Sequence, residues 1–208
     1  MQLYILAAAV AIAFGLVSAP AASAVELVTN GSFELPDIPP GTFTISNAVP
    51  GWTLGSGSLG SGIEIQDHIA GSPFVGDQFA ELDSDAVTAI FQDLATTPGD
   101  SYLLSFAFSP RPDVPENIMR IFWDGVLVDT LSESGVGNPD TVWTVHSYNL
   151  TAVDSSTRLT FDDLTEVSDS LGSYLDAVSV TTVPEPGTFA LLGLGLLPLG
   201  RFLTKKRR

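Results

Sequence analysis

The stretch Ala89-Ile-Phe-Gln-Asp-Leu-Ala-Thr-Thr-Pro-Gly-Asp-Ser-Tyr-Leu-Leu-Ser-Phe-Ala-Phe108 decides the fold class of this chain. Its second half, Tyr102–Phe108, alternates larger apolar side chains with smaller ones. Successive side chains of a β-strand point to opposite faces, so this alternation predicts a strand with one face in a core. The segment Thr97-Pro98-Gly99-Asp100 consists of turn residues and separates this strand from another apolar run. Such spacing predicts two strands joined by a tight turn, as in a hairpin.

Short runs of the same kind fill most of the chain. They are rich in β-branched and aromatic residues, and one separator, Asp124-Gly125, has the composition of a two-residue hairpin loop. No heptad, no long helical stripe and no repeat of about 20–50 residues occurs between them. We therefore expect an all-β sandwich or barrel without helical crossovers. The expected strands are Val25–Val28, Phe43–Ile45, Ile63–Gln66, Gln78–Glu81, Ala86–Leu94, Ser101–Phe108, Ile118–Trp123, Val126–Leu131, Thr141–Leu150, Ser156–Asp162 and Tyr174–Thr182, with loops at Gly51–Gly62 and Ser109–Asn117.

The first 24 residues have the pattern of a secretory signal peptide. Leu3–Val17 is a continuous apolar run, and Ala22-Ser23-Ala24 is a small-residue cleavage site. We expect cleavage after Ala24, although Met1-Gln2 carries no basic side chain before the run. A retained membrane anchor is the alternative interpretation of this segment.

The last 26 residues, 183–208, form a second targeting segment. Val183-Pro184-Glu185-Pro186 precedes an uncharged Gly/Leu-rich run, and Lys205-Lys206-Arg207-Arg208 ends the chain. As a helix of about 1.5 Å per residue, Gly187–Leu203 would span about 25 Å, slightly less than the roughly 30 Å hydrocarbon core of a bilayer. The basic cluster would hold the end of this transmembrane helix on the cytoplasmic side. A plain C-terminal anchor is one interpretation.

These three parts, in this order, resemble the PEP-CTERM sorting signal, in which Pro184, Glu185 and Pro186 are the motif residues. The resemblance implies processing by an exosortase-type sorting protease and export to the cell surface or extracellular matrix. It also implies a Gram-negative-type bacterium that produces exopolysaccharide.

Between the two targeting segments lie 158 residues, 25–182, which suffice for one well-buried core. They hold three arginines against 23 carboxylates, a net charge of −20. A surface this negative repels phosphate backbones, so nucleic acid is not an expected partner. The chain has no Cys, which excludes disulfides, thiolate zinc sites and a cysteine nucleophile.

Three stretches follow one another in segment 25–182: Asn30-Gly31-Ser32-Phe33-Glu34, then Gly76–Asp83 followed by Ile90–Leu94, and Leu175-Asp176-Ala177-Val178 near the end. In this order they resemble galactose-binding-like jelly rolls, the fold of many carbohydrate-binding modules. The resemblance implies a jelly-roll β-sandwich with a structural calcium bound by Glu34 and Asp176. Calcium takes six to eight oxygen ligands, which suits a chain so rich in carboxylates. Strand-end capping or simple solvation of the two carboxylates is the alternative.

A glycan site needs exposed aromatic rings and polar groups at their rim. Trp123 and Trp143 are the candidate rings, while Trp52 is expected in the core. Arg111 is the candidate polar group, to bind a sugar acid or to pair with Asp113.

We assign no catalytic residues. The acid pairs Glu64/Asp67, Glu81/Asp83 and Asp162/Asp163 arise easily by chance in so acidic a chain, and no Gly-x-Ser-x-Gly elbow is present. The sequence therefore predicts an exported, non-catalytic protein that binds exopolysaccharide or another glycan. A structural or adhesive envelope protein bridged by divalent cations is the alternative, and a glycan hydrolase the third hypothesis.

Overall fold

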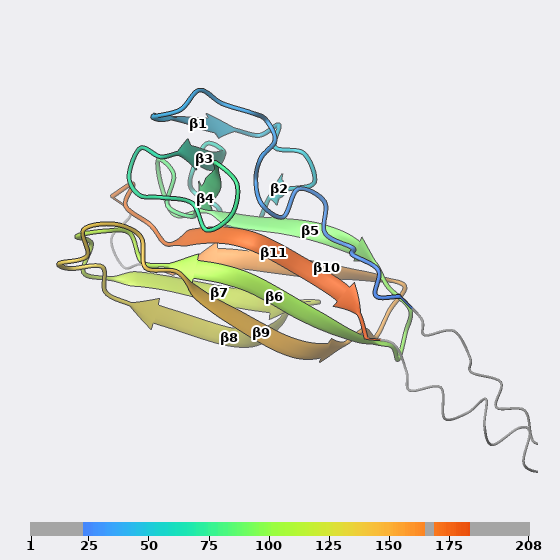
Figure 1. Ribbon diagram of the computed structural model, residues 1–208. Helices are drawn as coiled ribbons and strands as arrows, with labels where there is room; N and C mark the ends of the chain where they lie inside the picture. Colours follow the sequence, from blue (N-terminus) through green and yellow to red (C-terminus); the bar gives the residue numbers. More distant parts are fainter. Residues whose placement is uncertain (1–22, 165–168, 184–208) are drawn as a thin grey trace, which may run out of the picture. The chain divides into compact units, whose positions relative to one another are not determined.

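The computed structural model describes residues 23–164 and 169–183, and Ala24–Val183 form one compact unit. The described residues build two antiparallel sheets that pack face to face (Figure 1). The strands are β1 (Thr42–Ser46), β2 (Thr53–Leu54), β3 (Ile63–Asp67), β4 (Phe79–Glu81), β5 (Ala89–Ala95), β6 (Ser101–Ser109), β7 (Asn117–Trp123), β8 (Val126–Glu133), β9 (Thr144–Thr151), β10 (Ser156–Asp163) and β11 (Tyr174–Thr182).

The first sheet has the strand order β1-β3-β4-β11-β6-β9, and the second has the order β2-β5-β10-β7-β8. Consecutive strands frequently change sheet, and the chain's last strand, β11, lies between β4 and β6 in the middle of the first sheet. The predicted all-β jelly-roll sandwich is therefore confirmed. Within the described residues, no helix has the length and apolar character needed to cross a bilayer. The expected signal peptide lies outside the described residues except for Ser23 and Ala24, and the expected sorting helix, Gly187–Leu203, lies outside them entirely.

The core lies between the sheets and follows the alternation of β6. Tyr102, Leu104, Phe106 and Phe108 all point inward and are almost completely buried. Phe106 meets Phe161 of β10 edge to face, with ring centroids 5.0 Å apart. Burying one such side chain contributes about 1.5–3 kcal/mol relative to exposure, so this row alone strongly favours the face-to-face arrangement.

Ten of the expected strands are present, with ends shifted by a few residues. Val25–Val28 is not a strand, since only Glu26 forms an isolated bridge, to Thr181, and the short β2 lies within the expected loop Gly51–Gly62. Asp124-Gly125 closes the β7–β8 hairpin with φ angles of 52° and 76°, as predicted. The hairpin predicted at Thr97–Asp100 is wrong, because this turn carries the chain from β5 in the second sheet to β6 in the first.

The outer face of the first sheet is also partly buried, at its β3–β4–β11 end. All five residues of β3 are buried: Ile63 and Ile65 belong to the core, so their alternating neighbours point outward. Cross-strand register places these outward residues beside those of β4 and β11, with Glu64 opposite Glu81 and Glu81 opposite Tyr174. We call this set the covered face: it consists of Glu64, Gln66, Phe79, Glu81 and Tyr174.

Candidate functional site

The segment Asn30–Glu34 forms a compact turn at the start of the unit. Asn30 has a positive φ of 55°, and its side-chain oxygen accepts the N–H of Leu35 at 3.0 Å. The Trp52 indole donates to the Asn30 carbonyl at 3.0 Å, and Phe33 stacks on Trp52 with centroids 5.3 Å apart. Trp52 is buried, as expected. This anchoring fixes the backbone that carries Glu34.

Asp176 is positioned by a bulge in β11. The register with β6 shifts between Asp176 and Ser179, and Ala177 has a φ of 50°. The Val178 N–H donates to the Gly31 carbonyl at 2.8 Å, and a Cβ at residue 31 would lie 1.9 Å from the Val178 oxygen. A glycine is therefore required at position 31 for the opening turn to approach the bulge.

Glu34 and Asp176 both hold the segment 74–78. Glu34 Oε1 accepts the N–H groups of Asp77 and Gln78 at 3.0 and 3.1 Å. Asp176 Oδ2 accepts those of Phe74 and Val75 at 2.9 and 3.0 Å.

The environment of Asp176 raises its pKa to about 7, chiefly through burial, and the like charge of Glu34 adds to the rise. The two predicted calcium ligands thus lie close enough to interact electrostatically. They supply the hard oxygen donors that calcium prefers, so the residues fit the ion, although its remaining ligands would have to be backbone carbonyls or water. No group of three or more His, Asp or Glu side chains placed to hold a metal occurs among the described residues.

The covered face contains a buried charge cluster. Glu81 is fully buried, and its carboxylate accepts the Gly172 N–H at 2.7 Å and an Arg111 N–H at 2.5 Å. The Gln66 amide nitrogen donates to Glu64 at 3.0 Å and also to Glu81. Two carboxylates from neighbouring strands are therefore joined by one amide and balanced by one guanidinium.

Burial dominates the titration of this cluster. It raises the pKa of Glu64 to about 7, against the hydrogen bond from Gln66 and the charge of Arg111. Burial also raises the pKa of Glu81 well above its usual value; Arg111 opposes this rise, while Glu64 reinforces it. The two carboxyl groups are thus coupled, and near neutral pH the pair retains a proton.

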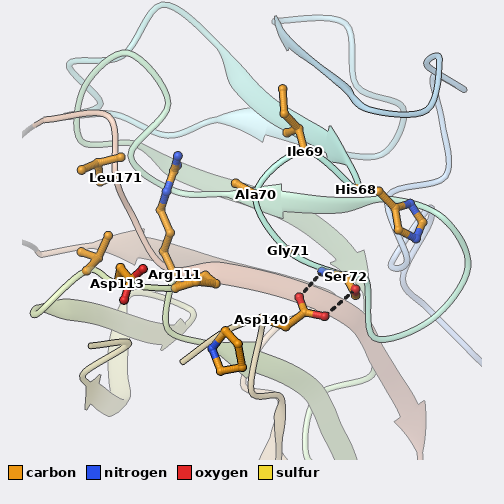
Figure 2. Close-up of a pocket in the computed structure, with 12 residues that line it drawn as sticks. His68, Ile69, Ala70, Gly71, Ser72, Arg111, Asp113, Asp140 and Leu171 are labelled. Atoms are coloured by element: carbon orange, nitrogen blue, oxygen red, sulfur yellow. Dashed lines mark hydrogen bonds between the residues drawn. The ribbon is translucent and has the colours of Figure 1, made fainter. Parts of the chain in front are cut away.

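A cavity of about 630 Å³ opens beside the covered face (Figure 2). Asp140 accepts the Ser72 N–H at 2.8 Å and its hydroxyl at 2.7 Å, which ties segments 68–72 and 139–141 together. Figure 2 shows Arg111 and His68 on opposite sides of the cavity. The wall thus combines carboxylates, a guanidinium, an imidazole and apolar groups. Its lining residues are His68, Ile69, Ala70, Gly71, Ser72, Arg111, Pro112, Asp113, Val114, Pro139, Asp140 and Leu171.

The three residues predicted to bind a glycan lie in different environments. Trp123 is only 6 % exposed, and its indole donates to the Thr151 carbonyl at 3.0 Å, so its ring offers no face for a sugar. Trp143 precedes β9, donates to the Ser72 carbonyl at 2.8 Å and packs edge-on against Phe79, which supports the cavity wall from behind. Arg111 does line the cavity, but it pairs with Glu81 and not with Asp113.

Sequence reasoning missed the pairing of Glu64 with Glu81. Each was considered with its neighbour in sequence, as Glu64/Asp67 and Glu81/Asp83. Their proximity depends on the β3–β4 register. The sequence signal for this pairing was that each glutamate alternates with apolar residues in an expected strand, so both point to the face away from the core.

Comparison with known proteins gives one motif and several distant structural similarities. Residues 182–207 match the PEP-CTERM protein-sorting motif, so the chain carries the sorting signal that its C-terminal sequence resembles, including Pro184, Glu185 and Pro186. Those three residues lie outside the described part of the structure. No curated protein matches the chain.

Three solved structures are distantly similar to this chain. A family 35 carbohydrate binding module from Clostridium thermocellum is 16% identical, with 76% of this chain and 98% of that chain covered and a TM-score of 0.43. The module TmCBM61, in complex with beta-1,4-galactotriose, is 12% identical, with coverages of 76% and 99% and a TM-score of 0.49. The arabinose-bound arabinofuranosidase MgGH51 is 13% identical, with a TM-score of 0.47; the match covers 76% of this chain but only 26% of that one.

Proposed function

We propose that this protein is exported, sorted by an exosortase-type protease at its C-terminal motif, and binds exopolysaccharide or another glycan without cleaving it. The observation that carries the glycan proposal is the cavity beside the covered face. Its volume lies in the range of sites for small molecules, and its wall mixes apolar surface with a few convergent polar groups. The sorting motif supports placement at the cell surface or in the matrix of a Gram-negative-type bacterium.

The burial of Glu81 supports a non-catalytic role. A glycoside hydrolase needs two carboxyl groups that both reach the scissile bond, about 5 or about 6.5–9.5 Å apart. Glu64 and Glu81 have the raised pKa values of catalytic acids, but Glu81 is fully buried and engaged by Arg111 and Gly172. It has no path to a glycosidic bond, so the pair is better explained as a structural support for the cavity.

A calcium ion bound by Glu34 and Asp176 is part of this proposal. When bound, the ion would supply positive charge beside two carboxylates whose mutual repulsion is otherwise relieved only by protonation and hydrogen bonds. The residues' own role is to hold segment 74–78, which continues from the cavity wall at Ser72. Ion binding would thereby stabilise the wall.

The test is a glycan array followed by calorimetry on the strongest binders, including exopolysaccharide from the native host. We expect the Asp140→Ala variant to lose most of the binding, because Asp140 lines the cavity and holds Ser72. The matched control is Asp154→Ala, which removes an exposed carboxylate from the β9–β10 turn, outside the cavity wall. Binding that survives Asp140→Ala unchanged would refute this site, and reducing-sugar release would refute the non-catalytic role.

The net charge of −20 of segment 25–182 favours the second candidate, an adhesive envelope protein bridged by divalent cations. Light scattering distinguishes the two. Calcium-dependent self-association in the absence of any sugar, together with an empty glycan array, would support the adhesive role and contradict glycan binding.

A further inference from the structure

A second cavity, of about 390 Å³, adjoins the first. The two share Ile69, Ala70 and Arg111 in their walls, so they lie side by side, and we call the two together the groove. Nothing in the proposed function assigns a role to this second cavity. The residues that line it are Phe43, Ile45, Glu64, Gln66, Ile69, Ala70, Ser84, Asp85, Arg111 and Ser170.

Strand register gives this cavity an apolar side and a polar side. Phe43 of the edge strand β1 lies directly opposite Gln66 of β3, and Ile45 lies opposite Glu64. Each pair shares one face of the sheet, because directly opposed residues point the same way. Phe43 is 53 % exposed, so a large part of its ring remains open to a ligand. An aromatic wall beside hydrogen-bonding groups matches the amphipathic surface of a pyranose ring.

Gln66 carries an unused hydrogen-bond acceptor. The side chain is 1 % exposed, its nitrogen serves both Glu64 and Glu81, and its Oε1 has no hydrogen-bond partner among the described residues. Leaving a buried acceptor unsatisfied costs free energy, so native structures almost always supply a donor. The hydroxyl of a sugar, which is both donor and acceptor, is a group that meets this need.

The charges of the cavity exclude an acidic sugar. The described residues contain three basic side chains of the Lys/Arg type, and each already pairs with a carboxylate: Arg111 with Glu81, Arg120 with Asp162 and Arg158 with Asp93. The charge of each guanidinium is therefore already balanced by a carboxylate, so the cavity offers a uronate or a sulfate no excess positive charge. Asp85 in the wall, and the net charge of −20 of segment 25–182 around it, repel an anionic ligand further.

We infer that the second cavity is a subsite for an uncharged pyranose unit, with the Phe43 ring as its stacking wall and Glu64 and Gln66 as its hydrogen-bonding floor. This inference rests on the proposed function and makes it more specific. The groove takes a neutral glycan, with one sugar unit against Phe43 and another beside Arg111 and Asp140, and discriminates against glycans built from uronic acids.

The experiment measures binding of neutral hexose oligosaccharides, each paired with the uronic-acid oligosaccharide of the same sugar and linkage. Calorimetry is run on the full chain and on three variants. Phe43→Ala removes the ring, Phe43→Trp retains an aromatic wall, and Leu59→Ala changes a more exposed apolar side chain that lines neither cavity. Both positions are exposed, so folding is not expected to change.

We expect the neutral member of a pair to bind at least about tenfold more tightly than the acidic one. Phe43→Ala should weaken neutral binding at least about fivefold, while Phe43→Trp and Leu59→Ala stay within about twofold of the original chain. Equal or tighter binding of the uronic-acid member would overturn the inference, and so would unchanged binding by Phe43→Ala while the original chain binds. If the original chain binds neither the neutral nor the uronic-acid oligosaccharides, the proposed function itself fails.

Discussion

Replacing Glu64 with Gln tests the electrostatics on which the covered face depends. Burial raises the pKa of Glu64 from its ordinary value of 4.5 to about 7 in the folded protein. Between these two values the folded chain holds a proton that the unfolded chain has released, so raising the pH favours unfolding. The stabilisation is fully present below about pH 4.5 and is lost as the pH rises through about 7.

The rise of this pKa from 4.5 to about 7 corresponds to about 3.5 kcal/mol in total, at about 1.4 kcal/mol per pKa unit. Glu81, whose pKa burial also raises, acts in the same direction and reinforces the fall. The Glu64→Gln variant keeps the shape of the side chain but has no proton to release, and it removes the like charge beside Glu81. We therefore expect its free energy of unfolding to fall less between pH 5 and pH 8, by up to about 3 kcal/mol.

Urea denaturation followed by tryptophan fluorescence, at pH 5, 6, 7 and 8, gives these free energies. Glu133→Gln is the matched control, because Glu133 lies exposed on the edge strand β8 and its loss should leave the profile of the original chain unchanged. Parallel profiles for the original chain and Glu64→Gln would refute the reasoning. Such a result would mean that Glu64 is solvated and ionised across the whole range.

Three further outcomes are expected. Arg111→Met leaves the buried Glu81 without its cation and should lower the free energy of unfolding by roughly 3–5 kcal/mol at pH 8. Its control, Arg158→Met, breaks an exposed ion pair and should cost under about 1 kcal/mol. Equal losses of the two variants in urea denaturation would contradict the burial of the Arg111–Glu81 pair. A chelator should lower the melting temperature by several degrees if calcium is bound, and Asp176→Asn should abolish this difference. A melting temperature that is the same with and without chelator would exclude the ion. The intact mass of the protein recovered from its native host should lack residues 1–24 and part of 183–208; a full-length mass would contradict both cleavages.

The strands were predictable because local alternation determines them. Along β6, the inward positions from Tyr102 to Phe108 are the larger side chains, and no other arrangement buries them together. The choice of sheet for each strand was not predictable in the same way. The residues Thr97–Asp100 form a turn whether the next strand pairs with the previous one or crosses to the opposite sheet, since the turn geometry is local and the pairing is not.

The candidate site could be anticipated only in part. Arg111 stood out as one of three arginines in 25–182, and it does line the cavity. The burial of Glu64, Gln66 and Glu81 had no sequence signal of its own, because charged residues alternating with apolar ones predict a solvated outer face. Trp123 shows the converse error, since an aromatic residue beside a hairpin turn is as compatible with the core as with a surface groove.

The position of the groove follows from a gradient of burial along β6. Its outward side chains pass from Leu103, which is exposed, through Ser105 to Ala107 and Ser109, which are fully buried. Ser109 lies opposite Tyr174, so this strand enters the covered face at the end where β11 begins. Segments 68–72, 110–114 and 139–143 all reach that end, tied by Asp140 to Ser72 and by Arg111 to Glu81. Both cavities open where these segments meet the sheet, because residues of the segments form much of their walls.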